Sequence, residues 1–233
     1  MIELYKFVPQ FGMRDASPFC LKLLTYLKLA DIPHETHEIL DPREAPKQKL
    51  PFIVDDGISI SDSEIIISHL KEKFGDPLND GLSPEQMANS HALSVMFAER
   101  YYWAGLVYPR WLKAEYQPVL VDAWFGSVPK LLRGFVTRMV FKEMAKRAEG
   151  HGIGKHSESE VFDLALSDLR AVENLMGNKP FLMDEKPREI DATAYAFLVN
   201  TTAEPFRTPM SEYVKKSNIL MEYIERVDKS AFA

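Results

Sequence analysis

The sequence predicts an α/β domain followed by an all-α domain. Within residues 1–75, short strand-like apolar runs alternate with helical patterns in the order βαβ and then ββα, which indicates a mixed sheet with helices packed on it. From residue 85 onward, apolar residues recur at helical spacing. Turn-forming residues dominate positions 76–84. We therefore expect a first domain at 1–75, a linker at 76–84 and a helical domain at 85–233.

The first βαβ unit begins with a short apolar strand at residues 2–8. Ser17 and Pro18 then predict a helix start, because serine accepts a hydrogen bond from a free backbone amide and proline in the first turn has no amide to satisfy. Pro33 ends the helical pattern, and weak alternation at 34–39 indicates the second strand. The polar segment that follows is too short for a long helix.

The ββα unit packs a hairpin and a helix start into a short stretch. Residues 52–54 indicate a strand, Asp56-Gly57 a tight turn, and 58–60 the returning strand. Side-chain caps at 61–63 precede apolar residues at helical spacing, so a second helix is expected to begin there. The free backbone amides at such a helix start favour the binding of an anion.

The second domain is predicted to contain only helices. Pro109 is expected to bend or end the first of them, and a Ser157-to-Glu160 capping box opens another. The expected helical regions are 85–112, 124–148, 157–175, 191–202 and 211–228.

One of these helical regions, 124–148, combines an apolar stripe with a basic end. Lys142, Lys146 and Arg147 lie near its C-terminus, where positive charge is favoured by the helix dipole. Helical spacing of the apolar residues predicts that the stripe faces the core. The stripe consists of Leu131, Leu132, Phe135, Met139 and Val140.

Composition narrows the classes of function. The 233-residue chain has a formal net charge of −6 and no basic run, which argues against a nucleic-acid partner. The sequence has no signal-peptide layout and no apolar run of membrane-spanning length, so a cytoplasmic protein without a membrane span is expected. A single cysteine, Cys20, excludes an internal disulfide and a zinc site built from several thiolates. No metal is expected.

Several co-linear motifs identify the chain as a member of a known family. Ser-Pro-Phe-Cys from Ser17, Leu50-Pro51, Asp62-Ser63 and a helical second half resemble the cytosolic glutathione S-transferases over the whole length. The resemblance implies a thioredoxin-like N-terminal domain and a C-terminal helical bundle. More narrowly, the chain resembles the Fax and metaxin-like (failed axon connections) branch. The motifs shared with that branch are SPFCLKL from 17, YW from 102, RW from 110, GIGKH from 152 and KPREIDAT from 186.

The resemblance implies a glutathione site in the first domain. It makes Pro51 a cis proline and has the backbone of Leu50 pair with the cysteinyl part of glutathione, as an added strand would. Ser63 would hold the γ-glutamyl carboxylate and Asp62 its ammonium group. Local structure alone also explains these residues, since Pro51 can simply begin a strand and Asp62-Ser63 can simply cap a helix.

Basic side chains near these motifs are candidates for the glycine carboxylate of glutathione. Lys49 is the preferred candidate and Arg14 the second. Each is equally interpreted as a solvated surface charge.

Ser17 is the catalytic candidate by resemblance, because in serine-type transferases this hydroxyl donates a hydrogen bond to the glutathione sulfur. The competing interpretation is that Ser17 is only the cap of its helix. Cys20, one turn into the same apolar helix, is interpreted as a buried side chain. Glutathionylation of Cys20 is the alternative.

An aromatic and basic group in the second domain is the candidate pocket for a second substrate. It contains Tyr102, Trp103, Arg110 and Trp111. Core packing is the alternative for aromatic residues at helical spacing.

The predicted function is therefore a transferase that binds glutathione as co-substrate and conjugates it to a hydrophobic electrophile, or performs a related thiol-dependent reaction. Family resemblance implies a homodimer. The alternative is a metaxin-like binding or scaffold protein that retains the fold without catalysis, because fold does not establish activity.

Overall fold

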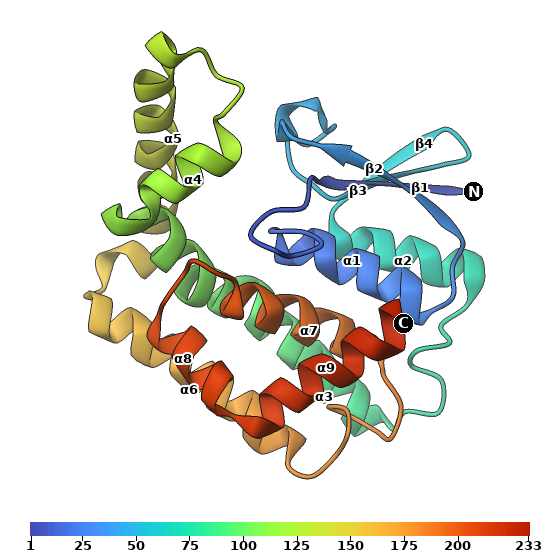
Figure 1. The fold of residues 1–233 in the computed structure, drawn as a ribbon. Helices are drawn as coiled ribbons and strands as arrows, with labels where there is room; N and C mark the ends of the chain where they lie inside the picture. The colour runs from blue at the N-terminus through green and yellow to red at the C-terminus, as the bar shows by residue number, and fades with distance from the viewer.

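A computed structural model describes residues 1–233 and shows a four-stranded sheet followed by a helical bundle (Figure 1). The strand order is β2-β1-β3-β4, in which β1 and β2 are parallel and the other two pairs are antiparallel. This is the predicted mixed sheet. The strands are β1 (Ile2–Phe7), β2 (His34–Ile39), β3 (Phe52–Asp55) and β4 (Ile58–Ser61).

Two helices, α1 (Pro18–Leu29) and α2 (Ser63–Phe74), pack on one face of this sheet (Figure 1). Their buried apolar residues join those of the strands in one core, which includes Leu4, Leu23 and Ile53. A short 3₁₀ turn, η1 (Pro42–Glu44), occupies the polar segment between β2 and β3. The predicted absence of a long helix there is confirmed.

The rest of the chain is helical, as predicted. Its central helix, α7, packs against α1, so the two parts share a continuous buried surface to which Leu21 of α1 contributes. The helices of this part are α3 (Pro84–Val95), the π-helical η2 (Met96–Leu112), α4 (Gln117–Trp124), α5 (Lys130–His151), α6 (Glu158–Met176), α7 (Glu189–Thr202), α8 (Pro209–Lys216) and α9 (Asn218–Phe232). Two short 3₁₀ turns, η3 (Ala114–Tyr116) and η4 (Ile153–Lys155), connect them.

Pro109 lies inside η2, which continues to Leu112, so the helix ends at the predicted residue and not at the proline itself. One helix prediction needs correction. The region 211–228, predicted as one helix, is divided between α8 and α9. Ser217 between them is extended, and its side chain accepts a hydrogen bond from the Leu220 amide, so it caps a new helix.

The prediction that the apolar stripe of α5 faces the core was wrong. Leu131 is 98% exposed and Phe135 67% exposed, and only Thr137 and Ala148 of this 22-residue helix are buried. Figure 1 shows why: α5 stands off the body of the molecule, with its C-terminal end joining the bundle and its N-terminal end at the far tip. The first turns of α5 therefore have no element on their outer side.

Candidate functional site

Strand register brings the three predicted glutathione segments to one edge of the sheet. Tyr5 of β1 pairs with Phe52 of β3, and Phe52 pairs with Ser61 of β4. Leu50-Pro51 immediately precedes Phe52, and Asp62-Ser63 immediately follows Ser61, so these two dipeptides are neighbours. β1 ends at the same edge, and its C-terminal loop leads to Ser17 at the start of α1.

Ser17 caps α1, as predicted. Its side-chain oxygen accepts a hydrogen bond from the Cys20 amide at 3.4 Å, and Pro18 occupies the first helical position. The Ser17 side chain is partly exposed, whereas Cys20 is fully buried. Burial raises the pKa of the Cys20 thiol well above its ordinary value. Cys20 is therefore a buried, protonated thiol, which agrees with its interpretation as a packing residue.

A buried carboxyl below the Ser17 turn was not predicted from the sequence. Asp15 is fully buried; its Oδ1 accepts a hydrogen bond from the Ser17 amide at 2.7 Å, and its Oδ2 has no partner. Burial raises the pKa of Asp15 to about 8, and the hydrogen bond from Ser17 opposes this rise. The signal in the sequence was an aspartate two residues before the cap, a spacing at which its side chain accepts from the backbone.

Leu50-Pro51 is a cis peptide, as the resemblance implied. Leu50 is buried in a small cluster with Cys20 and Phe52, so the start of β3 packs directly against the first turn of α1. Lys49 precedes this pair; it is exposed and forms no ion pair. Its ammonium group is therefore available to a carboxylate placed along this edge.

Asp62 and Ser63 form the start of α2. The Asp62 side chain is exposed and accepts a hydrogen bond from the Glu64 amide at 3.0 Å, while Ser63 is buried in the first turn. Asp62 has a backbone φ of 88°, a value that residues other than glycine rarely adopt. Such backbone strain accumulates at functional positions, which supports a binding role in addition to capping.

Arg110, predicted in the second-substrate pocket, instead joins the two parts of the molecule. Its guanidinium is buried and donates to the Ala16 carbonyl at 3.2 Å and to the Asn200 side chain at 3.1 Å. Burial lowers the pKa of Arg110 to about 10. Asn200 on α7 also donates to the Asp15 carbonyl, at 3.5 Å. Arg110 and Asn200 therefore hold the backbone immediately before Ser17.

The aromatic candidates separate into two groups. Tyr102 lies edge-on to Phe19 in the first turn of α1, with ring centroids 4.8 Å apart, so it lies near Ser17. Trp103 stacks on His151 at 4.8 Å, and Trp111 lies 6.1 Å from Phe141. Both tryptophans thus contact the inner side of α5.

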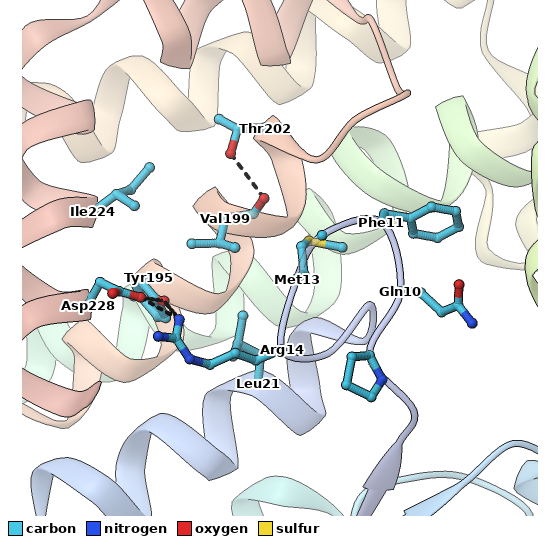
Figure 2. Close-up of a pocket in the computed structure, with 12 residues that line it drawn as sticks. Gln10, Phe11, Met13, Arg14, Leu21, Tyr195, Val199, Thr202, Ile224 and Asp228 are labelled. Carbon is cyan, nitrogen blue, oxygen red and sulfur yellow. Dashed lines mark hydrogen bonds and ion pairs between the residues drawn. The ribbon is translucent and has the colours of Figure 1, made fainter. Parts of the chain in front are cut away.

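A cavity of about 820 Å³ lies between the loop after β1 and helices α7 and α9 (Figure 2). Arg14 projects into it and contacts Asp228 at 2.6 Å, with its guanidinium 4.0 Å from the centre of the Phe232 ring. The Tyr195 hydroxyl donates to the same carboxylate. Arg14 is thus paired within the protein. Of the predicted site residues, only Arg14 lines this cavity.

The histidines and acidic residues form no metal-binding group: nowhere do three or more His, Cys, Asp or Glu side chains converge as ligands. Every helix is either too short or too polar to cross a bilayer.

Comparison with known proteins identifies the family. Residues 18–116 match the glutathione S-transferase N-terminal domain and residues 165–227 the glutathione S-transferase C-terminal domain. The chain is 35% identical to the isoprene-epoxide–glutathione S-transferase of Rhodococcus sp. (strain AD45), covering 98% of each chain. This protein belongs to the glutathione S-transferase family. The predicted family is therefore confirmed.

Other relatives of this glutathione S-transferase family member belong to the narrower branch. The chain is 28% identical to Failed axon connections of Drosophila melanogaster, with 100% of this chain and 58% of the relative covered, and 25% identical to human Metaxin-2, with 81% and 72% covered. The chain thus spans little more than half the length of the Drosophila protein.

Solved structures agree on the fold. The β-etherase LigF of Sphingobium sp. strain SYK-6 has a TM-score of 0.65 at 16% identity, covering 97% of this chain and 94% of that chain. Human glutathione transferase theta-2, solved with glutathione, has a TM-score of 0.61 at 17% identity, covering 100% and 83%. The predicted α/β plus all-α transferase fold is confirmed.

Proposed function

We propose that this protein binds glutathione at the sheet edge and conjugates it, through its sulfur, to a hydrophobic electrophile. The observation that carries the proposal is the register that makes Leu50-Pro51 and Asp62-Ser63 neighbours beside the start of α1. An extended anionic peptide fits this edge, because it offers a strand end for backbone pairing and a helix start for a carboxylate.

Each segment has one task in this proposal. The backbone of Leu50 pairs with the cysteinyl residue of glutathione, and the Ser63 amide and hydroxyl hold the γ-glutamyl carboxylate. Asp62 accepts from the γ-glutamyl ammonium. Lys49 holds the glycine carboxylate, and we prefer it to Arg14, because Arg14 is already paired with Asp228 and Lys49 has no acidic partner.

Ser17 then acts on the sulfur. The glutathione thiol loses its proton to water and the thiolate attacks a carbon of the epoxide. The carbon–sulfur bond forms as the carbon–oxygen bond of the ring breaks, and the alkoxide that is left takes up a proton from water. A hydroxyl that donates to the thiolate, at the positive end of α1, lowers the thiol pKa. A hydrogen bond to a charged group contributes about 1.5–3 kcal/mol. This corresponds to one or two units of pKa, since one unit is about 1.4 kcal/mol.

Calorimetric titration with glutathione tests binding. We expect a one-site isotherm that weakens when Ser63 is changed to alanine, because a hydroxyl donor to the carboxylate is lost. Ser157→Ala is the control, since it removes a serine hydroxyl at the start of another helix, α6, in the other part of the chain. An absence of binding at millimolar glutathione would overturn the proposal.

The catalytic role of Ser17 is tested by kinetics with a small alkene epoxide, the electrophile class named in the Rhodococcus relative. We expect Ser17→Ala to reduce kcat/KM by about 10- to 100-fold, from the loss of one charged hydrogen bond. Ser17→Gly should lose as much activity, although glycine retains most of the capping stability. Ser17→Thr, which keeps a hydroxyl, should retain activity. Unchanged turnover in Ser17→Ala would remove Ser17 from the mechanism and leave the binding proposal intact.

A non-catalytic scaffold is the second candidate. Relatives named Failed axon connections and Metaxin-2 favour it, since neither name describes a transferase. Cys20 is the one cysteine and its thiol is fully buried, so the chain has no pair of cysteines for dithiol redox catalysis. Glutathione binding without turnover of any epoxide, halide or mixed disulfide would favour the scaffold over the enzyme.

Homodimerisation and a cytoplasmic location are part of the same proposal, and homodimerisation is the part implied by family resemblance. Sedimentation equilibrium of the purified chain tests the first, and fractionation of the native host tests the second.

A further inference from the structure

The outer face of α5 carries four apolar side chains in contact with water. Leu131, Leu132, Phe135 and Met139 are 98%, 56%, 67% and 58% exposed, and we name these four residues the outward stripe. Leu131, Phe135 and Met139 follow one another at four-residue spacing, so they lie along one line of the helix. A contiguous group of large apolar side chains in water marks an interaction surface.

The same helix is strongly basic in an acidic protein. α5 contains six Lys or Arg residues and two Glu residues, whereas the whole chain has a net charge of −6. Lys142 and Lys146 continue the line of the outward stripe at helical spacing. These two lysines, together with Lys130 and Arg138, are exposed and form no ion pair with any acidic residue. An anionic surface therefore complements the charge around the outward stripe.

We propose that the outer side of α5 docks on an anionic phospholipid surface, with the outward stripe among the acyl chains and the lysines among the headgroups. Helices that lie in the membrane interface have this composition: Leu and Phe on one side, Lys and Arg beside them. Cations near an anionic leaflet are each attracted to it. Binding of this kind is peripheral and requires no membrane-spanning helix.

The position of α5 makes this contact possible despite the negative charge of the whole chain. Figure 1 shows α5 projecting from the body with its N-terminal end farthest out. Leu131 is the second residue of this helix. At physiological salt, charges farther than about 8 Å apart are largely screened. A surface that meets the tip of α5 therefore experiences mainly the local positive charge.

A lipid surface fits these observations better than a protein partner. The outward stripe is a narrow line of exposed apolar side chains on a single helix. The cations beside it have no fixed partners that would specify a geometry. A fluid anionic surface accommodates such an arrangement without a complementary groove. A second copy of the chain is the competing occupant, and it is an outcome of the test.

Cosedimentation of the full chain with lipid vesicles tests the proposal. We expect binding to vesicles of mixed phosphatidylserine and phosphatidylcholine, weakening as salt is raised, and much less binding to phosphatidylcholine alone. The double substitution Leu131→Ser with Phe135→Ser should reduce partitioning at least about 10-fold. Lys142→Glu with Lys146→Glu should do the same by reversing the local charge.

Matched controls make the same chemical changes elsewhere. Ile58→Ser with Ile219→Ser removes two other exposed apolar side chains, and Lys186→Glu with Lys229→Glu reverses two other exposed charges. Both controls should bind vesicles as the unmodified protein does. All these positions are exposed, so thermal unfolding should show folded variants.

Three outcomes would overturn the proposal. The first is no binding to the anionic vesicles. The second is equal loss of binding in the α5 variants and the control variants. The third is a dimer that does not bind vesicles and that the α5 substitutions dissociate in the analytical ultracentrifuge. That result would assign the outward stripe to contact between two copies of the chain. None of these outcomes depends on glutathione binding.

Discussion

Helices α5 and α7 both contain large apolar residues, but only α7 is buried. Eleven of the 14 residues of α7 are buried, whereas two of the 22 residues of α5 are buried. Both helices contain Leu, Val and Phe. The difference is in the charges: after Asp191, α7 has no charged residue, while α5 has eight along its length. Burial of a helix is thus indicated better by missing charges than by the presence of apolar residues.

The two helices also differ in their contacts with the rest of the protein. Through Asn200, α7 contacts the backbone just before Ser17, so the candidate catalytic residue is anchored to the best-packed helix of the protein. α5 is joined to the bundle only at its inner side, by contacts such as Trp103 with His151. These positions are consistent with α7 as a rigid support for the proposed chemistry and with α5 as a projecting helix for docking.

The same substitution in the two helices should give the largest difference. Phe197 of α7 is fully buried, 5.3 Å from Phe97 between ring centroids. Phe197→Ala should lower the free energy of unfolding by about 3–5 kcal/mol, because it leaves a cavity. Phe135→Ala in α5 should change it by less than about 0.5 kcal/mol, as is usual for an exposed site. Urea unfolding of both variants measures this, and equal losses would contradict the contrast.

A second test concerns the buried carboxyl beside α7. The pKa of Asp15 is about 8 in the folded protein, above the ordinary value of 3.8. The folded state therefore binds the proton more tightly, and the stability from this group is complete below pH 4 and lost as pH rises toward 8. The slope from one such group is about 1.4 kcal/mol per pH unit.

Asp15→Asn should remove this slope, because asparagine does not titrate and its oxygen still accepts from the Ser17 amide. Urea unfolding at several pH values compares the variant with the unmodified protein. Glu149→Gln on the exposed side of α5 is the control, and it should leave the pH profile in place. A profile in Asp15→Asn as steep as before would show that another group causes the pH dependence.

The smallest expected effect is within α5 itself. Gly134 is exposed, and an added Cβ would meet no atom within 4 Å. Alanine is favoured over glycine in a helix by about 1 kcal/mol, so Gly134→Ala should slow amide exchange in the outer turns of α5 by about fivefold. Because the outer side of these turns is in water, global unfolding should stay nearly unchanged. A matching rise in global stability would show that α5 unfolds together with the bundle.

Local chemistry in the sequence was sufficient for most of the fold. The Ser17-Pro18 cap, the Asp56-Gly57 turn and the Ser157 capping box are confirmed, because each depends on hydrogen bonds within a few residues. The break at Ser217 was missed although serine is a cap residue, since the apolar spacing continues across it. At Ser217 the apolar periodicity predicted one continuous helix, whereas the serine cap predicted a new helix start, and the cap was the correct signal.

The sequence by itself determined the element order, the family and the segments proposed to hold glutathione, because these depend on residue types at short spacing. Only the tertiary structure decided that Leu50-Pro51 and Asp62-Ser63 are neighbours, that Arg110 is buried against Ala16, and that the face of Leu131 is in water. Each of these depends on which distant element covers a side chain. Spacing along one helix states that a face is apolar, and only packing determines what, if anything, lies against it.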